Sequence, residues 1–208
     1  MNILGVLLAG GLSRRMGGGD KGLMPLGGRP VMARAFDRLK AQTGDVIINA
    51  NGDPNRFAGF SAPIVPDTIN GFAGPLAGVL AGLRYAQKLD QAPSFIVTAA
   101  ADTPFFPDNL VSALQSKAQD EATIVLATSN ERRHPTFGLW PVNLANDLET
   151  WLENEKNRKV LLWVDRHNWE TADFKSSTVS DLIIDPFFNI NTPEDFATAQ
   201  SILEGATQ

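Results

Sequence analysis

The sequence predicts an α/β fold, a three-layer Rossmann-like domain in which a mainly parallel central sheet lies between helices. Over residues 1–128, short apolar runs alternate with longer segments whose apolar residues recur at helical spacing. The links between these segments are short and rich in Gly, Pro, Asn and Asp. The first apolar run leads directly into a loop of glycines and cations, at a position where α/β folds bind ligands.

The first apolar run, ILGVLL at residues 3–8, predicts a strand that is buried on both faces. Backbone N–H groups of glycines can approach an anion closely, and cations supply countercharge, so the following loop is typical of a polyphosphate site. It is not a Walker A loop, because Lys21 is followed by Gly22 where Ser or Thr is needed. The alternative is a surface loop with solvated cations. The loop residues concerned are Gly10, Gly11, Gly17, Gly18, Gly19, Arg14, Arg15 and Lys21.

The next segments continue the alternation of helices and strands. Pro30 suits the first turn of a helix that ends near Gly44, and Pro75 begins a second helix with apolar residues on one face. A third helix begins at Pro107. Strands are expected at residues 46–48, 64–65, 95–99 and 123–127. Strands joined through helices by short links predict a parallel sheet.

The pattern after residue 128 is less regular. We expect a strand at residues 136–140, a helix at 144–152, a helix or strand at 160–164 and an edge strand at 169–174. The last helix has a clear start, with Thr192 as N-cap, Pro193 at the first helical position and Asp195 as the carboxylate of a capping box. Asn191 is the alternative cap.

Length and composition limit the classes of protein that the chain can belong to. With 208 residues it suits a single domain, and no apolar run approaches the roughly 20 residues of a membrane span. There is no cysteine, so disulfides and thiolate metal sites are excluded. A net charge of −5 disfavours a nucleic-acid partner. Because the N-terminus does not resemble a signal peptide, we expect a cytoplasmic protein.

Four polar or glycine positions follow four different predicted strands. They are Gly10, Asn49, Asp67 and Asp102. Because the carboxyl ends of parallel strands share one edge of a sheet, we expect these residues to meet in one ligand site. Asn49 and Asp67 have an alternative use as turn residues. Asp102 follows small apolar residues, where a charge needs a partner, and a carboxylate at the end of a central strand is typical of a Mg²⁺ ligand beside substrate phosphates.

The residues also carry a family resemblance. The pattern L-A-G-G-x-S-x-R-M-G-x-x-D-K at residues 8–21 resembles the signature of molybdenum cofactor guanylyltransferases. Further segments resemble the same family in order and spacing, so that the resemblance covers nearly the whole chain. They are IINAN at 47–51, GPLAG at 74–78, DTPF at 102–105, RHPTFGLW at 133–140 and PFFNINTPED at 186–195.

This resemblance implies a fold of the nucleotide-diphospho-sugar transferase type and a set of site residues. It implies that GTP is held by residues 1–128 and molybdopterin by residues 129–208. The residues implied to bind GTP are Leu8, Ala9, Gly10, Gly11, Lys21, Asn49, Asp67 and Asp102. Asp102 would also hold Mg²⁺, with Mn²⁺ as a substitute, while Asn189 and Asn191 would lie beside the molybdopterin site.

The implied reaction is attack by the terminal phosphate of molybdopterin on the α-phosphorus of GTP, which releases pyrophosphate. Arg15, Lys21 and Asp102 are the expected catalytic residues, with the two cations on the leaving pyrophosphate. A phosphate monoester is already largely anionic at neutral pH, so no general base is needed. His134 either contacts the pterin or has a structural role.

Three other functions remain open from the sequence. A cytidylyltransferase acting on the same pterin commonly reads L-A-A-G, whereas residues 8–11 here are L-A-G-G. A sugar-1-phosphate nucleotidyltransferase would have a longer second half than residues 129–208. A non-catalytic nucleotide-binding or carrier module would need neither Lys21 nor Asp102. The resemblance further implies transient contact with cofactor-delivery proteins and molybdoenzymes.

Overall fold

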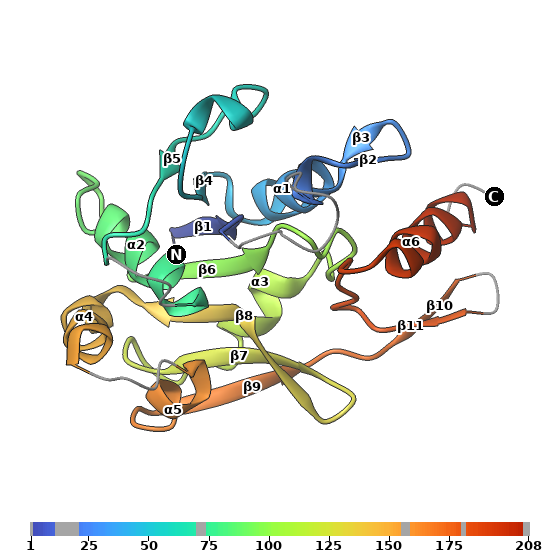
Figure 1. Cartoon of the computed structure of the whole chain (residues 1–208). Helices are drawn as coiled ribbons and strands as arrows, with labels where there is room; N and C mark the ends of the chain where they lie inside the picture. Colours follow the sequence, from blue (N-terminus) through green and yellow to red (C-terminus); the bar gives the residue numbers. More distant parts are fainter. Residues whose placement is uncertain (1, 11–20, 70–73, 155–158, 180–181, 206–208) are drawn as a thin grey trace.

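A seven-stranded sheet organises the computed structural model, which describes residues 2–10, 21–69, 74–154, 159–179 and 182–205 (Figure 1). The strand order is β5-β4-β1-β6-β8-β7-β9. The strands are β1 (Ile3–Leu8), β4 (Val46–Asn49), β5 (Ile64–Val65), β6 (Phe95–Ala100), β7 (Ile124–Ser129), β8 (Arg132–Pro141) and β9 (Trp169–Asp173). The mixed but mainly parallel sheet between helices confirms the predicted fold class.

Strand β8 is the one member of this sheet that runs against the others. It lies between β6 and β7 and pairs antiparallel with both, while every other neighbouring pair is parallel. The carboxyl ends of six strands therefore share one edge with the amino end of β8. This edge, which we call the carboxyl edge, lies on the right in Figure 1.

Helices cover both faces of the sheet. On one face, α1 (Val31–Thr43) and α3 (Leu110–Gln115) pack against alternate strand residues such as Leu7, Val97 and Leu139. On the other face, α2 (Pro75–Ala86), α4 (Ala145–Asn154) and α5 (Val160–Val164) pack against the intervening strand residues. Alternate residues of β1 thus pack into two separate apolar cores, as expected for a strand that is buried on both faces.

A third, smaller apolar cluster joins the C-terminal helix to the start of α1. Helix α6 (Pro193–Gly205) packs with Ala199 against Leu26 and Val31, next to the short hairpin of β2 (Pro25–Leu26) and β3 (Arg29–Pro30). Thr192 Oγ accepts a hydrogen bond from Asp195 N (3.1 Å), and the Asp195 carboxylate accepts one from Thr192 N (2.9 Å). The predicted capping box is therefore confirmed.

The structure differs from the sequence prediction at several boundaries. Pro30 is the N-cap of α1 and belongs to β3, and α3 begins at Leu110. The hairpin of β10 (Ser177–Val179) and β11 (Leu182–Ile184) was not predicted, since its strands are only three residues long. Short 3-10 segments occur at η1 (Lys21–Leu23), η2 (Pro54–Phe57) and η3 (Val142–Leu144).

The tight turn between β7 and β8 was also missed. Its two central residues, Asn130 (φ 48°) and Glu131 (φ 62°), adopt left-handed backbone conformations, as a type I′ hairpin turn requires. Asn tolerates this conformation well, but Glu does not, and the sequence therefore gave no turn signal here. The turn extends β8 back to Arg132, so that β8 begins earlier than the predicted residue 136.

Among the described residues, none of the helices is both long enough and apolar enough to cross a membrane.

Replacing Glu131 by Gly should stabilise the fold. Gly removes the cost of a side chain at positive φ but adds entropy to the unfolded chain, so the expected net gain is about 0.5–1 kcal/mol. Urea-induced unfolding of the wild type, Glu131→Gly and Glu131→Ala measures it. The Ala variant keeps the strain and should show no gain; equal stabilisation by both variants would contradict this explanation.

Candidate functional site

The carboxyl edge gathers most of the described site residues that the sequence predicted. Beyond the strand ends the backbone ladder continues, with Ala9 N donating to Asn49 O (2.9 Å) and Ala101 N donating to Leu8 O (3.0 Å). Gly10 therefore lies beside Asn49. The turn that contains Asp102 comes directly after β6, which is the neighbour of β1 in the sheet. The predicted convergence of strand ends is present in the fold.

The Asn49 side chain is buried, with 3% of its surface exposed, and its orientation is fixed by two acceptors. Its Nδ2 donates to Val65 O (3.1 Å) and to Asp67 Oδ1 (2.9 Å). Because neither acceptor can donate, the amide nitrogen must face them and Oδ1 must face the other way. Within the described part of the chain, no group donates to Asn49 Oδ1, so this oxygen is an acceptor available to a ligand.

Asn51 is a site residue that the sequence analysis did not select. Its Nδ2 donates to Asp67 Oδ2 (2.8 Å), and its Oδ1 accepts from Asp67 N (2.9 Å). The two asparagines thus hold one oxygen each of the same carboxylate. The pattern N-A-N indicated this pairing, since residues two apart on an extended chain point to the same side. However, the second Asn lies in a turn, where asparagine is common for other reasons.

Two glycines border Asn49 Oδ1. A Cβ on Gly78, in the second turn of α2, would overlap Asn49 Oδ1 and lie 2.6 Å from Leu8 Cδ2. A Cβ on Gly10 would lie 3.6 Å from Asn49 Oδ1, which is ordinary van der Waals contact. Gly78 therefore permits α2 to approach the sheet, whereas a methyl group at Gly10 would make only ordinary contact with the described residues.

The Asp102 turn is tied to the segment that carries Asn189 and Asn191. Ile190 N donates to Asp102 O (2.9 Å), so residues 189–191 lie against this turn although they are far away in sequence. Both asparagines are exposed, and Asn191 N donates to Asp195 Oδ2 (2.8 Å) at the start of α6. Thr192, and not Asn191, supplies the side-chain cap.

Two of the predicted site residues lie outside the part of the chain that the structure describes, and a third is described only in part. Gly11 and Arg15 lie in the segment 11–20, outside the described residues, and only the backbone of Lys21 is described, at the start of η1. In the part of the chain that is described, no group of three His, Cys, Asp or Glu side chains is arranged to hold a metal ion by itself.

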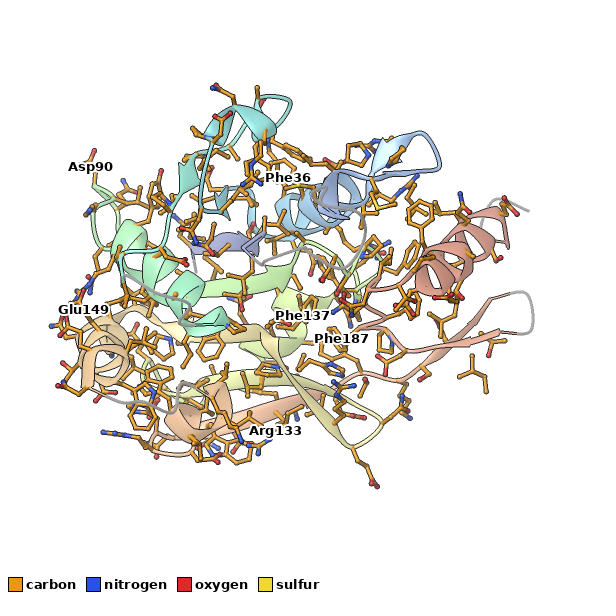
Figure 2. All side chains as sticks on the ribbon, in the orientation of Figure 1. Phe36, Asp90, Arg133, Phe137, Glu149 and Phe187 are labelled. Atoms are coloured by element: carbon orange, nitrogen blue, oxygen red, sulfur yellow. The ribbon has the colours of Figure 1, made fainter. Side chains whose placement is uncertain are left out.

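A second polar cluster lies at the carboxyl edge, on the other side of β6. Ser129 Oγ, fully buried, is 2.9 Å from both carboxylate oxygens of Asp185 and 2.7 Å from His134 Nε2. Asn130 Nδ2 and Phe187 N also donate to the Asp185 carboxylate, at 3.1 and 2.8 Å. The His134 ring packs on Phe187, with centroids 4.5 Å apart, and Figure 2 shows Phe187 next to Phe137 at this edge.

The proton positions in this cluster follow from its chemistry. Ser129 has one hydroxyl hydrogen, and Asp185 can only accept it, so Ser129 must in turn accept a hydrogen from His134 Nε2. Burial lowers the pKa of His134; the negative charge of Asp185 opposes this shift and Arg132 adds to it. His134 is therefore neutral at pH 7, with the hydrogen on Nε2 and a lone pair on Nδ1.

Comparisons with known proteins show which proteins the chain resembles. The family described as MobA-like NTP transferase domain matches residues 5–169. A relative from Mesorhizobium japonicum, named molybdenum cofactor guanylyltransferase, is 45% identical over 99% of this chain and 98% of its own length. Several further relatives of that name are 41–45% identical.

Solved structures share the fold. Molybdopterin-guanine dinucleotide biosynthesis protein A from Archaeoglobus fulgidus superposes with a TM-score of 0.72 at 20% identity, over 97% of this chain and 99% of that one. A manganese complex of a protein from Mycobacterium tuberculosis gives a TM-score of 0.68 at 15% identity, over 97% and 99% of the two chains.

The close approach at Gly78 gives a testable prediction. Gly78→Ala should destabilise the protein by about 1–3 kcal/mol, because either α2 or the Asn49 side chain must move to admit the methyl group. The matched control is Gly59→Ala, where a Cβ would meet nothing within 4 Å and φ is not in the left-handed range. Urea-induced unfolding of the two variants tests this; equal stability would show that the α2 contact is not tight.

Proposed function

The chain belongs to the molybdenum cofactor guanylyltransferase family of MobA-like NTP transferases, and on that premise we propose that it transfers GMP from GTP to the terminal phosphate of molybdopterin. An oxygen of the acceptor phosphate forms a bond to the α-phosphorus of GTP. The bond from the α-phosphorus to the bridging oxygen breaks, and pyrophosphate leaves. The products are molybdopterin guanine dinucleotide and pyrophosphate.

The single observation that supports this proposal most strongly is the available Asn49 Oδ1 between Gly10 and Gly78. This oxygen accepts no hydrogen bond from the described residues and is not one of their buried polar atoms without a partner, so a ligand donor can reach it. Guanine offers N–H donors at N1 and N2, and Asp67, held by Asn49 and Asn51, supplies further acceptor capacity beside them. These groups would read the base of GTP, in agreement with a nucleotide half at residues 1–128.

The phosphates would be held by the loop that follows β1. Ala9 N already donates to Asn49 O, so the loop N–H groups that face phosphate would begin at Gly10 and Gly11. Leu8 and Ala9 would contact the nucleotide through atoms other than the Ala9 N–H, which is already bonded to Asn49 O. Arg15 and Lys21 would stabilise the charge that develops on the leaving pyrophosphate.

A divalent metal fits the donor set at the Asp102 turn. Mg²⁺ is commonly bound by one or two carboxylates together with substrate phosphates and water, so a single carboxylate at a strand end is sufficient. When bound, Mg²⁺ or Mn²⁺ would neutralise phosphate charge. Asp102 would be the protein ligand, and the link from Ile190 N to Asp102 O would keep Asn189 and Asn191 close to the same phosphates.

The acceptor needs no general base from the protein. A phosphate monoester has a second pKa of about 6, so its attacking oxygen is already largely deprotonated at neutral pH. The remaining task of the protein is alignment of the two phosphates, which residues 129–208 would perform on the molybdopterin side. This supports catalysis by positioning and charge stabilisation.

A cytidylyltransferase is the second candidate function, because cytosine also offers an N–H donor to Asn49 Oδ1. The missing methyl group at Gly10, where cytidylyltransferases commonly have Ala, favours the larger purine base. A non-catalytic module is disfavoured because it would need neither Lys21 nor the Asp102 carboxylate.

The test of the proposed function is pyrophosphate release from molybdopterin with GTP, CTP, ATP or UTP, each with and without Mg²⁺. We expect release with GTP only, and loss of release when EDTA removes the metal. Release with CTP alone would instead assign cytidylyl transfer. No release with any nucleotide, from protein that still binds GTP, would support the non-catalytic module.

Asp102→Asn should leave the protein folded but lower turnover by about 100-fold or more, because the neutral amide neither binds the metal nor balances its charge. The control is Asp108→Asn, which removes an exposed carboxylate on the adjacent turn that pairs with Arg38. Steady-state pyrophosphate release measures both variants. Wild-type turnover of Asp102→Asn at saturating Mg²⁺ would exclude this carboxylate from catalysis.

A further inference from the structure

The Ser129–His134–Asp185 cluster has no part in the proposed nucleotide site, yet it occupies the same edge of the sheet. Ser129 ends β7, and His134 lies near the start of β8, on the far side of the turn at Asn130 and Glu131. Asp185 follows β11, more than 50 residues later. The cluster therefore connects the β7–β8 hairpin to the segment 185–191.

This cluster is not the nucleophilic triad that its residue types suggest. A nucleophilic serine gives its hydrogen to histidine and is open to the substrate. Here Ser129 is fully buried, and its hydrogen is directed to Asp185 while its oxygen accepts from His134 Nε2. The order of the hydrogen bonds is His134 to Ser129 to Asp185, which makes Ser129 a bridge and not a reacting group.

The bridge holds the first end of the segment 185–191. The Asp185 carboxylate accepts from Phe187 N, and Asp185 O accepts from Phe188 N (3.0 Å), so the carboxylate organises the turn that begins the segment. The Phe187 ring then packs against His134, Phe137 and Phe174, at centroid distances of 4.5, 4.7 and 5.4 Å. Backbone and ring of Phe187 are thus both fixed to the β7–β8 side.

The other end of the segment is held at the Asp102 turn, through Ile190 N. Asn189 lies exposed between these two attachments, and Asn191 follows directly. A change at either attachment would shift both asparagines relative to Asp102. For a reaction that depends on alignment, a displacement of about 1 Å is enough to lower the rate substantially.

Building on the proposed function, we propose that His134 is a positioning residue for the acceptor: through Ser129 and Asp185 it fixes the segment 185–191, and with it Asn189 and Asn191, in register with Asp102. His134 does not touch the reacting atoms. The neutral ring with its hydrogen on Nε2 is the form that maintains the chain of hydrogen bonds.

The chain contains a matched control in its only other histidine. His167 is also partly buried, places Nε2 3.1 Å from a carboxylate oxygen of Asp147, and packs on an aromatic ring, Trp163, at 4.7 Å. It belongs to the α4–α5 side of the molecule and has no contact with the segment 185–191 among the described residues. Loss of either histidine removes comparable interactions, but only His134 is connected to Asp102 through the segment 185–191.

The experiment compares His134→Leu, Ser129→Ala, His134→Gln and His167→Leu by pyrophosphate release, with GTP and molybdopterin varied separately. His134→Leu and Ser129→Ala should raise the KM for molybdopterin by about 10-fold and leave the KM for GTP unchanged. His134→Gln keeps a donor for Ser129 and should restore the wild-type KM. His167→Leu should lower Tm by about 2–4 °C, similarly to His134→Leu, without changing either KM.

Two results would overturn this role of His134. One is equal kinetic behaviour of His134→Leu and His167→Leu, which would mean that both histidines only stabilise the fold. The other is failure of His134→Gln to restore the KM, which would mean that His134 acts on the acceptor directly through Nδ1. If the wild type itself releases no pyrophosphate from GTP and molybdopterin, the proposed function fails instead, so the two failures are distinguishable.

Discussion

The antiparallel insertion of β8 between β6 and β7 is the constraint on which both halves of the carboxyl edge depend. Strand β6 ends at the Asp102 turn, and His134 lies near the beginning of β8. Because β8 is antiparallel to β6, its beginning lies at the same edge of the sheet as the end of β6. A parallel strand in this place would carry His134 to the opposite edge. The left-handed turn at Asn130 and Glu131 sets the pairing register of β7 and β8. This register places Ser129 diagonally opposite His134 on the same face of the sheet.

On the other side of β1, burial and hydrogen bonding together fix the proposed base site. Asn49 lies in the apolar face that contacts α2, where an unsatisfied amide would be costly. Its two donors are satisfied by Val65 and Asp67, and this leaves only the oxygen for a ligand. The site is thus organised before a nucleotide arrives, which lowers the cost of ordering side chains on binding.

The sequence predicted the layers, the parallel strands and their common edge because these follow from hydrophobic periodicity and short links. Asn49, Asp67 and Asp102 were assigned to this edge for the same reason, as polar residues that follow strands. Asn51 and Asp185 were missed because their importance depends on partners 16 and 56 residues away, which no local pattern encodes. The direction of β8 was missed because Asn-Glu is an uncommon pair for a type I′ turn.

The two halves of the edge would align the proposed substrates by different physical means. On the proposed nucleotide side, Asn49 ends a strand and the Asp67 carboxylate is held by the amides of Asn49 and Asn51, so its geometry depends on the sheet. The proposed acceptor side uses the segment 185–191, which has no regular structure. It is held at two points, by Asp185 to Ser129 and by Ile190 N to Asp102 O, so its geometry depends on these two attachments. Because a tethered segment has fewer contacts than a strand, small losses at either attachment should affect acceptor binding before they affect the fold. This separation would allow acceptor recognition to change while the nucleotide site stays intact.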